Sequence, residues 1–181
     1  MSNLVNKARE FAREKHAAQL RRYTEQPYFV HLEEVAALVE RTGLSENAIA
    51  AALLHDVVED QGVPIEAICA NFNPDVALMV LDLTDIPAGK GLNRAERKTV
   101  DAHRLSRASA DTQSIKCADL ISNTSSIVQH DPGFARLYLK EIRQVLEVLQ
   151  KANDRLRQQA WASLQQAEEV LGLVSSGNRR L

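Results

Sequence analysis

Residues 51–60, AALLHDVVED, pass from an apolar run to four ionisable side chains, His55, Asp56, Glu59 and Asp60. Burying groups of this kind costs several kcal/mol unless something pairs with them or ligates them. A chain that sets them directly beside an apolar helix face is usually holding a ligand there. The stretch therefore predicts a buried helix that carries a functional site at its polar end.

The predicted helix begins after Ser45, a suitable N-cap, and ends before Gly62. Elsewhere apolar residues also recur with helical spacing, and no alternating strand pattern or hairpin turn stands out. We predict an all-α, single-domain bundle of about seven to nine helices. Its helices are expected at 3–18, 31–42, 45–60, 65–72, 75–84, 94–108, 113–129 and 134–172, the last with a candidate division near 153–154. Residues 86–93 are expected to form a loop, and residues 175–181 a flexible tail after a domain that covers 1–174.

The composition indicates a folded protein without a charge bias. The 181 residues are 45% hydrophobic and carry 22 basic against 24 acidic side chains. This balance predicts no nucleic-acid or membrane partner, but a small anionic substrate needs only a local basic patch. The amphipathic N-terminus lacks the apolar core of a signal peptide, and no apolar run approaches roughly 20 residues. We expect a cytoplasmic protein in which Cys69 and Cys117 are buried, reduced thiols.

On a continuous helix, His55 and Glu59 are four residues apart, as are Asp56 and Asp60, so the two pairs form adjacent stripes. An imidazole beside a carboxylate is a natural beginning for a divalent-metal site, and the second pair could orient or deprotonate a water. A His-Asp dipeptide alone is weak evidence, because such a histidine is also common in ordinary cores.

Further ligands would have to come from other segments. His31 begins the second predicted helix, and Asp119 lies on a predicted helix face with Lys116 and Asn123. A polar stripe of this kind is equally typical of a solvated surface, and Lys116 fits a structural ion pair. His16 has no motif partner, so we expect it to be a surface residue or a satisfied one.

The order of these pieces resembles the HD-domain metal phosphohydrolases, in which a lone His precedes a His-Asp pair and a distant Asp. More narrowly, five segments of residues 5–150 resemble the hydrolase domain of RelA/SpoT-type alarmone enzymes: QLRR with PYFVH, AALLHDVVED, LTD, ERK and IKCADLISN. The chain has no room for a synthetase domain. It is therefore most similar to the stand-alone small alarmone hydrolases, including the metazoan SpoT homologue.

The resemblance implies a single divalent metal, manganese, and removal of the 3′-pyrophosphate of guanosine tetra- or pentaphosphate to give GDP or GTP. Glu59 and Asp60 would manage the attacking water. The implied metal ligands are His31, His55, Asp56 and Asp119. The implied substrate contacts are Arg21, Arg22, Tyr28, Lys98 and Asn123. Arginine forks suit phosphates. Tyr28 could instead serve in packing, and Lys98 lies on a predicted helix that is charged all round.

Two departures from the family pattern bear on substrate choice. Leu120 stands where the family usually has a basic residue, and the loop after Arg22 is about one residue short. An adenosine alarmone is therefore an alternative substrate. A general HD nucleotide phosphohydrolase that acts on 5′-phosphates and a non-catalytic helical domain are further alternatives. The sequence leaves the oligomeric state open.

Overall fold

The computed structural model describes residues 2–85 and 91–173, and these residues form ten helices and no strand. The predicted all-α, single-domain fold is confirmed. Part of the predicted 86–93 loop and the whole predicted tail at 175–181 lie outside the described residues. The helices are α1 (Asn3–Lys15), α2 (Phe29–Glu40), α3 (Glu46–Leu54), α4 (Val57–Gln61), α5 (Ile65–Asn71), α6 (Pro74–Leu83), α7 (Arg94–Arg107), α8 (Ala110–His130), α9 (Pro132–Val148) and α10 (Asp154–Val170).

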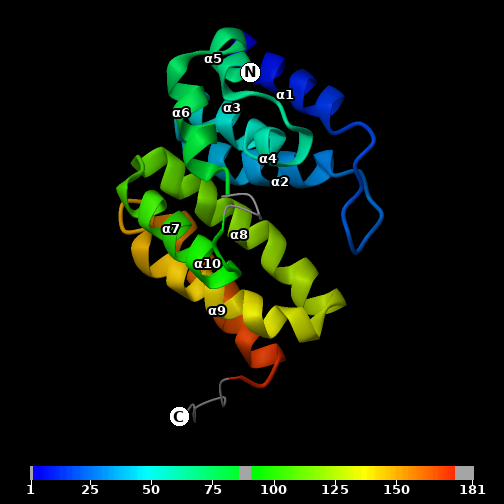
Figure 1. The fold of residues 1–181 in the computed structure, drawn as a ribbon, viewed down its shortest axis with the longest axis vertical. Helices are drawn as coiled ribbons and strands as arrows, with labels where there is room; N and C mark the ends of the chain where they lie inside the picture. The colour runs from blue at the N-terminus through cyan, green and yellow to red at the C-terminus, as the bar shows by residue number, and fades with distance from the viewer. Residues whose placement is uncertain (1, 86–90, 174–181) are drawn as a thin grey trace.

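Two helices organise the bundle. Helix α3 is buried at every residue from Ala48 to Leu54, and it packs on α1, α2, α6 and α8. Its alanines allow these neighbours to approach closely. Helix α8 runs diagonally between the end of the molecule formed by α1–α6 and the end formed by α7, α9 and α10 (Figure 1). It contacts helices from both ends, so a site between α2, α3 and α8 lies near the middle of the molecule.

The predicted 45–60 helix is divided at the His-Asp pair. Ser45 caps its start as expected, with its hydroxyl oxygen accepting from the Ala48 N–H at 3.2 Å. The ring Nδ1 of His55 lies 2.8 Å from the carbonyl oxygen of Ala52, the acceptor that the Asp56 N–H would use in a continuous helix. The backbone leaves regular α geometry at Asp56 (φ −100°, ψ −2°) and resumes as α4. This division accounts for a tenth helix beyond the expected seven to nine.

The second candidate division, near 153–154, is present. Asn153 is the N-cap of α10, and its side-chain oxygen accepts from the N–H groups of Arg155 and Leu156 at 3.1 and 3.4 Å. Helix α9 ends at Val148, so the predicted 134–172 stretch becomes two packed helices.

The prediction of two buried thiols is wrong for one of them. Cys117 is fully buried on α8, but Cys69 is exposed on α5. Both cysteines lie on helices with apolar neighbours in the sequence. The side of α5 that packs against the core is therefore what leaves the Cys69 thiol exposed. None of the described helices is both long and apolar enough to cross a bilayer.

Candidate metal centre and adjoining cavity

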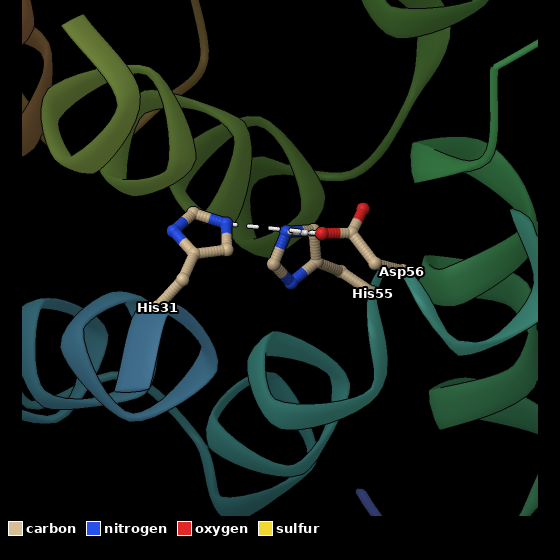
Figure 2. A group of neighbouring side chains, drawn as sticks. All are labelled: His31, His55 and Asp56. Atoms are coloured by element: carbon tan, nitrogen blue, oxygen red, sulfur yellow. Dashed lines mark ion pairs between the residues drawn. The ribbon is translucent and has the colours of Figure 1, made fainter. Parts of the chain in front are cut away.

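Four predicted metal ligands converge at the junction of three helices. His31 lies on α2, His55 and Asp56 follow α3, and Asp119 lies on α8. The Nε2 atom of His31 is 3.4 Å from Asp119 Oδ1 and 3.7 Å from Asp56 Oδ2. The Nε2 atom of His55 is 3.0 Å from Asp56 Oδ2 and 3.7 Å from Asp119 Oδ1. Figure 2 shows both imidazoles turned toward the Asp56 carboxylate.

The hydrogen bonds of the two histidines suit a metal. His31 Nδ1 lies 2.9 Å from the Ser122 hydroxyl oxygen, which itself donates to Glu34 at 2.6 Å. His31 therefore donates through Nδ1, as His55 does to the Ala52 carbonyl. In the neutral form of each ring, which is the form that binds a metal, Nε2 then carries a lone pair, and each Nε2 is buried without a hydrogen-bond partner among the described residues. Partners of this kind typically fix the tautomer of a metal-ligating histidine.

One atom of each of His31, His55 and Asp56 lies within 4.8 Å of the others, a spacing that one cation could bridge. Asp119 Oδ1 lies close to the same two nitrogens. Two imidazoles and two carboxylates form a donor set for a divalent first-row metal such as manganese. Because the unpartnered nitrogens and the carboxylates face one another, the residues fit the implied cation.

Two side chains support the Asp119 carboxylate. Lys116 donates to Oδ2 at 2.8 Å and Asn123 donates to Oδ1 at 2.7 Å. Burial would raise the pKa of Asp119, but Lys116 and the two imidazoles outweigh it and hold that pKa well below its ordinary value. Asp119 is therefore an anion ready to ligate.

Asp56 lies against His55, and Tyr28 donates its hydroxyl to Asp56 Oδ2 at 2.6 Å. Burial works against both charges, but the attraction between them lowers the pKa of Asp56 and raises that of His55. Tyr28 is held in its neutral, donating form, because burial and then Asp56 raise its pKa. Tyr28 thus orients a candidate ligand in addition to lining the cavity.

Glu59 and Asp60 lie on α4 beside the cluster, and each has an oxygen tied to a neighbour. Glu59 Oε2 accepts from the Asp85 N–H at 3.0 Å, and Asp60 Oδ2 accepts from the Gln19 side chain at 2.8 Å. Burial raises the pKa of both carboxyls. For Glu59 the neighbouring Asp85 carboxylate raises it further. Carboxylates with raised pKa values beside a metal site are suited to proton transfer.

A cavity of about 210 Å³ opens beside the cluster. Its lining includes the carboxylates of Asp56, Glu59, Asp60 and Asp119, and it also includes the apolar residues Leu83, Leu120, Ile142 and Val145, together called the apolar wall. Of the predicted substrate contacts, Tyr28, Lys98 and Asn123 line it. Its other lining residues are Asp85, Lys116, Tyr138 and Glu141.

The two predicted arginines do not line this cavity. Arg21 forms an ion pair with Glu34 at 3.2 Å, and the Arg22 guanidinium lies 5.4 Å from the centre of the Tyr23 ring. Both belong to the loop before α2, in which Leu20 and Pro27 form an isolated bridge. Glu34 also accepts from Ser122, so Arg21 is connected to the hydrogen-bond partner of His31.

Three further cavity residues, Asp85, Lys116 and Tyr138, were not among the predicted ligands and substrate contacts. Asp85 pairs with Lys98, and Lys116, read as a structural ion pair, touches the candidate ligand Asp119. Tyr138 enters the cavity from α9. Two features of the sequence could have assigned these residues to the site. Asp85 lies in the quoted LTD segment, and Lys116 is three residues before Asp119 on the same predicted helix. The resemblance named Tyr138, with Lys140 and Arg143, only as nearby possibilities for the family's late substrate contacts, and of these three Tyr138 lines the cavity.

The HD domain family matches residues 8–154 of the chain. The GTP pyrophosphokinase rsh of Brucella ovis is 32% identical over 168 residues, which cover 81% of this chain. The chain spans only about a fifth (22%) of the length of that protein.

Shorter relatives match over most of their length. The guanosine-3′,5′-bis(diphosphate) 3′-pyrophosphohydrolase MESH1 of Drosophila melanogaster is 33% identical over 126 residues, covering 68% of this chain and 69% of that protein. MESH1 of Xenopus tropicalis is 34% identical over 132 residues, covering 71% and 72%.

A solved structure described as a metazoan orthologue of SpoT that hydrolyses ppGpp superposes with a TM-score of 0.81 at 27% identity. The alignment covers 96% of this chain and 98% of that one. With the family match over most of its length, the chain belongs to the HD domain family and, within it, to the relatives of MESH1.

Proposed function

We propose that this chain is a metal-dependent hydrolase that removes the 3′-pyrophosphate from guanosine tetra- or pentaphosphate, giving GDP or GTP and pyrophosphate. The observation that carries the proposal is the position of Glu59 and Asp60. They share the cavity wall with Asp56 and Asp119 but are distinct from the four-ligand cluster. The MESH1 relatives carry this activity in their names.

The proposed cofactor is one manganese ion, held by His31, His55, Asp56 and Asp119. When bound, such a cation would polarise a phosphate oxygen and lower the pKa of a water. The chain's part is to present two imidazole lone pairs and two anionic carboxylates in fixed orientations. Ser122 and the Ala52 carbonyl orient the imidazoles, and Tyr28 orients Asp56.

In the proposed reaction a water oxygen bonds to the phosphorus attached to the 3′-oxygen, and the bond from that phosphorus to the 3′-oxygen breaks. Glu59, fixed by the Asp85 N–H, accepts the water proton, and the released 3′-oxygen takes up a proton. Negative charge on the transferred group is met by Lys98 and Lys116, which line the cavity. Each amine already faces a carboxylate, Asp85 or Asp119, so each is held in place before substrate binds.

The nucleoside is proposed to lie along the apolar wall, with the Asn123 amide beside it. Arg21 and Arg22 are proposed to bind phosphates at the outer edge of the site, with Arg21 exchanging its Glu34 partner for phosphate. The catalytic unit is proposed to be residues 1–174, acting in the cytoplasm on a small nucleotide without nucleic-acid or membrane partners.

Leu120 is the observation that supports one alternative, an alarmone with adenine in place of guanine, as an additional substrate. It is only 5% exposed and lies in the cavity wall, where it offers no charge or hydrogen bond to the edge of a base. Such a wall would not distinguish the exocyclic groups of guanine from those of adenine.

The proposal is tested with purified protein, manganese and a panel of nucleotides, namely guanosine tetraphosphate, its adenosine counterpart and 5′-nucleotides. We expect GDP and pyrophosphate from the first, with the rate abolished by a chelator. Orthophosphate as the product would support a general nucleotide phosphohydrolase instead. No turnover of any nucleotide, with manganese bound, would contradict the proposal.

A further inference from the structure

His16 is a buried histidine behind the site that the proposed reaction does not use. It caps the C-terminal end of α1, is 1% exposed, and stacks on Tyr28 with ring centres 5.3 Å apart. It belongs to neither the ligand cluster nor the cavity lining. Of the two expectations for His16, a surface residue or a satisfied one, the first is wrong because α1 ends against the loop that carries Tyr28, and the second holds for Nδ1 but not for Nε2.

A chain of two hydrogen bonds leads from His16 to Asp60. The Nδ1 atom of His16 lies 2.6 Å from Gln19 Oε1, and Gln19 Nε2 donates to Asp60 Oδ2 at 2.8 Å. Gln61 also donates to Gln19 Oε1. The Gln19 backbone is fixed as well, because its N–H donates to the His16 carbonyl and its own carbonyl accepts from the Tyr28 N–H.

The chain has one consistent polarity when Asp60 is ionised. A carboxylate only accepts hydrogen bonds, so Gln19 must turn its NH₂ group toward Asp60 and its carbonyl toward His16. His16 must then carry its proton on Nδ1, which leaves Nε2 as a lone pair. That Nε2 is buried and has no hydrogen-bond partner among the described residues.

Such a histidine is costly for packing alone. A buried nitrogen without a partner loses its hydration, a cost that an apolar side chain of similar size would avoid. The compensating feature is the Nδ1 contact, which sets the orientation of Gln19. Gln61 is a second donor to the same Gln19 oxygen, and its Nε2 lies 3.3 Å from His16 Nδ1, so the two donors converge on the Gln19 carbonyl.

We propose that His16 is a positioning residue for Asp60, acting through Gln19 to hold the carboxylate at the cavity wall. The inference rests on the proposed hydrolase function and deepens it, by adding a support that reaches the acidic pair from α1. His16 does not touch the substrate. It restricts Asp60 to the orientation in which Oδ2 faces Gln19 and Oδ1 remains available to the site.

The hydrogen-bond chain is tested without any substrate by ¹⁵N NMR of the imidazole nitrogens in the whole protein near pH 7. We expect the neutral Nδ1–H tautomer for His16, and loss of that preference in Gln19→Met. A His16 ring protonated on Nε2 alone would overturn the inference. Because no turnover is measured, this result is independent of the reaction that the protein catalyses.

Steady-state kinetics, with whichever nucleotide the protein hydrolyses, then test whether the position of Asp60 affects the rate. We expect His16→Ala to lower kcat by about tenfold with little change in KM, a typical consequence of misplacing a reactive group. His16→Asn, whose amide can replace the Nδ1–H donor, should recover most of that loss. His103→Ala, on an exposed face of α7, is the control and should leave kcat unchanged.

A double-mutant cycle separates positioning from general destabilisation. If His16 acts through Asp60, His16→Ala should cost nothing further in an Asp60→Asn background. Equal losses in both backgrounds, or failure of His16→Asn to restore kcat while the protein is folded, would overturn the inference. Absence of turnover in the wild type would instead contradict the proposed function, and the NMR result would still stand.

Discussion

The Nε2 atom of His31 on α2 lies 3.4 Å from the Oδ1 atom of Asp119 on α8. This contact joins the helices of the N-terminal half to the central helix α8, because α2 and α8 pack along one another. The candidate metal cluster is therefore also a junction in the fold. A substitution in it is expected to change metal affinity first and stability second.

Asp119→Asn is expected to abolish binding of the metal ion and turnover while preserving the helical fold. The amide keeps the shape of the side chain and can still accept from Lys116, but it no longer supplies an anionic ligand. Metal content of protein purified without a chelator, measured by mass spectrometry, checks this, and circular dichroism checks the fold.

Asp154→Asn, on the exposed start of α10, is the matched control and should keep the metal. Full metal content in Asp119→Asn would show that α8 supplies no ligand. Asp119→Ala is a harsher test, because it leaves Lys116 largely buried beside an empty space, and part of any loss would then reflect stability.

Glu59→Gln is expected to keep the metal and lose most of the rate, by roughly 10²–10⁴-fold if Glu59 is the general base. The Gln oxygen can still accept from the Asp85 N–H, so α4 should stay in place. Burial and the Asp85 carboxylate raise the pKa of Glu59 above its ordinary value of 4.5. The wild-type rate should therefore fall on the acid side as Glu59 takes up a proton and can no longer act as a base.

The measurement is kcat against pH for the wild type, together with the metal content and kcat of the variant. Glu10→Gln, which removes only an exposed ion pair with Arg13, is the control. If Glu59→Gln kept full activity with guanosine tetraphosphate, another group would have to accept the proton.

The four candidate ligands could be named from the sequence because each lies in a short motif whose order along the chain resembles that of the family. The spacing of apolar residues did not predict that the helix is interrupted at His55 and Asp56. The apolar pattern of Leu53, Leu54, Val57 and Val58 continues through it. The break follows from a side-chain hydrogen bond to the Ala52 carbonyl, a local competition with the backbone that composition does not reveal.

The hydrogen bonds that support the candidate ligands and the acidic pair were the least predictable part of the site. The hydrogen-bond chain from His16 through Gln19 to Asp60 joins α1, the following loop and α4. Because these segments are far apart in the sequence, no spacing of residues predicts the chain. Arg21 shows the reverse case. Its motif position indicated a phosphate contact, but the structure pairs it with Glu34 instead of placing it in the cavity lining.

The two cysteines are expected to react at very different rates. Cys69 is exposed on α5, whereas Cys117 is fully buried and burial raises its pKa to about 12. Titration of the native protein near pH 8 with a chromogenic disulfide should show one fast thiol and one that reacts only as the protein unfolds. Cys69→Ser should remove the fast phase and Cys117→Ser should keep it. Two fast thiols in the wild type would mean that α8 opens readily.

The ion pair of Lys98 with Asp85 predicts a pH-dependent contribution to stability. Burial would raise the pKa of Asp85, but Lys116 and Lys98 outweigh it and set that pKa below its ordinary value of 3.8. A carboxyl whose pKa is lower in the folded state stabilises the protein above the unfolded pKa. That stabilisation is lost as the pH falls through the folded value. Asp85→Asn should therefore lower the free energy of unfolding at pH 7 by about 1 kcal/mol, the usual size for a partly exposed pair.

The measurement is urea unfolding of the metal-free protein, kept so with a chelator, at a series of pH values from 7 to about 3, the range in which carboxyl groups titrate. The stabilities of wild type and Asp85→Asn should converge below about pH 4, because protonation of Asp85 removes the same charge that the substitution removes. Asp154→Asn should run parallel to the wild type throughout. A constant difference between wild type and Asp85→Asn across the whole range would mean that Asp85 acts through packing and its hydrogen bonds, and that its charge contributes nothing.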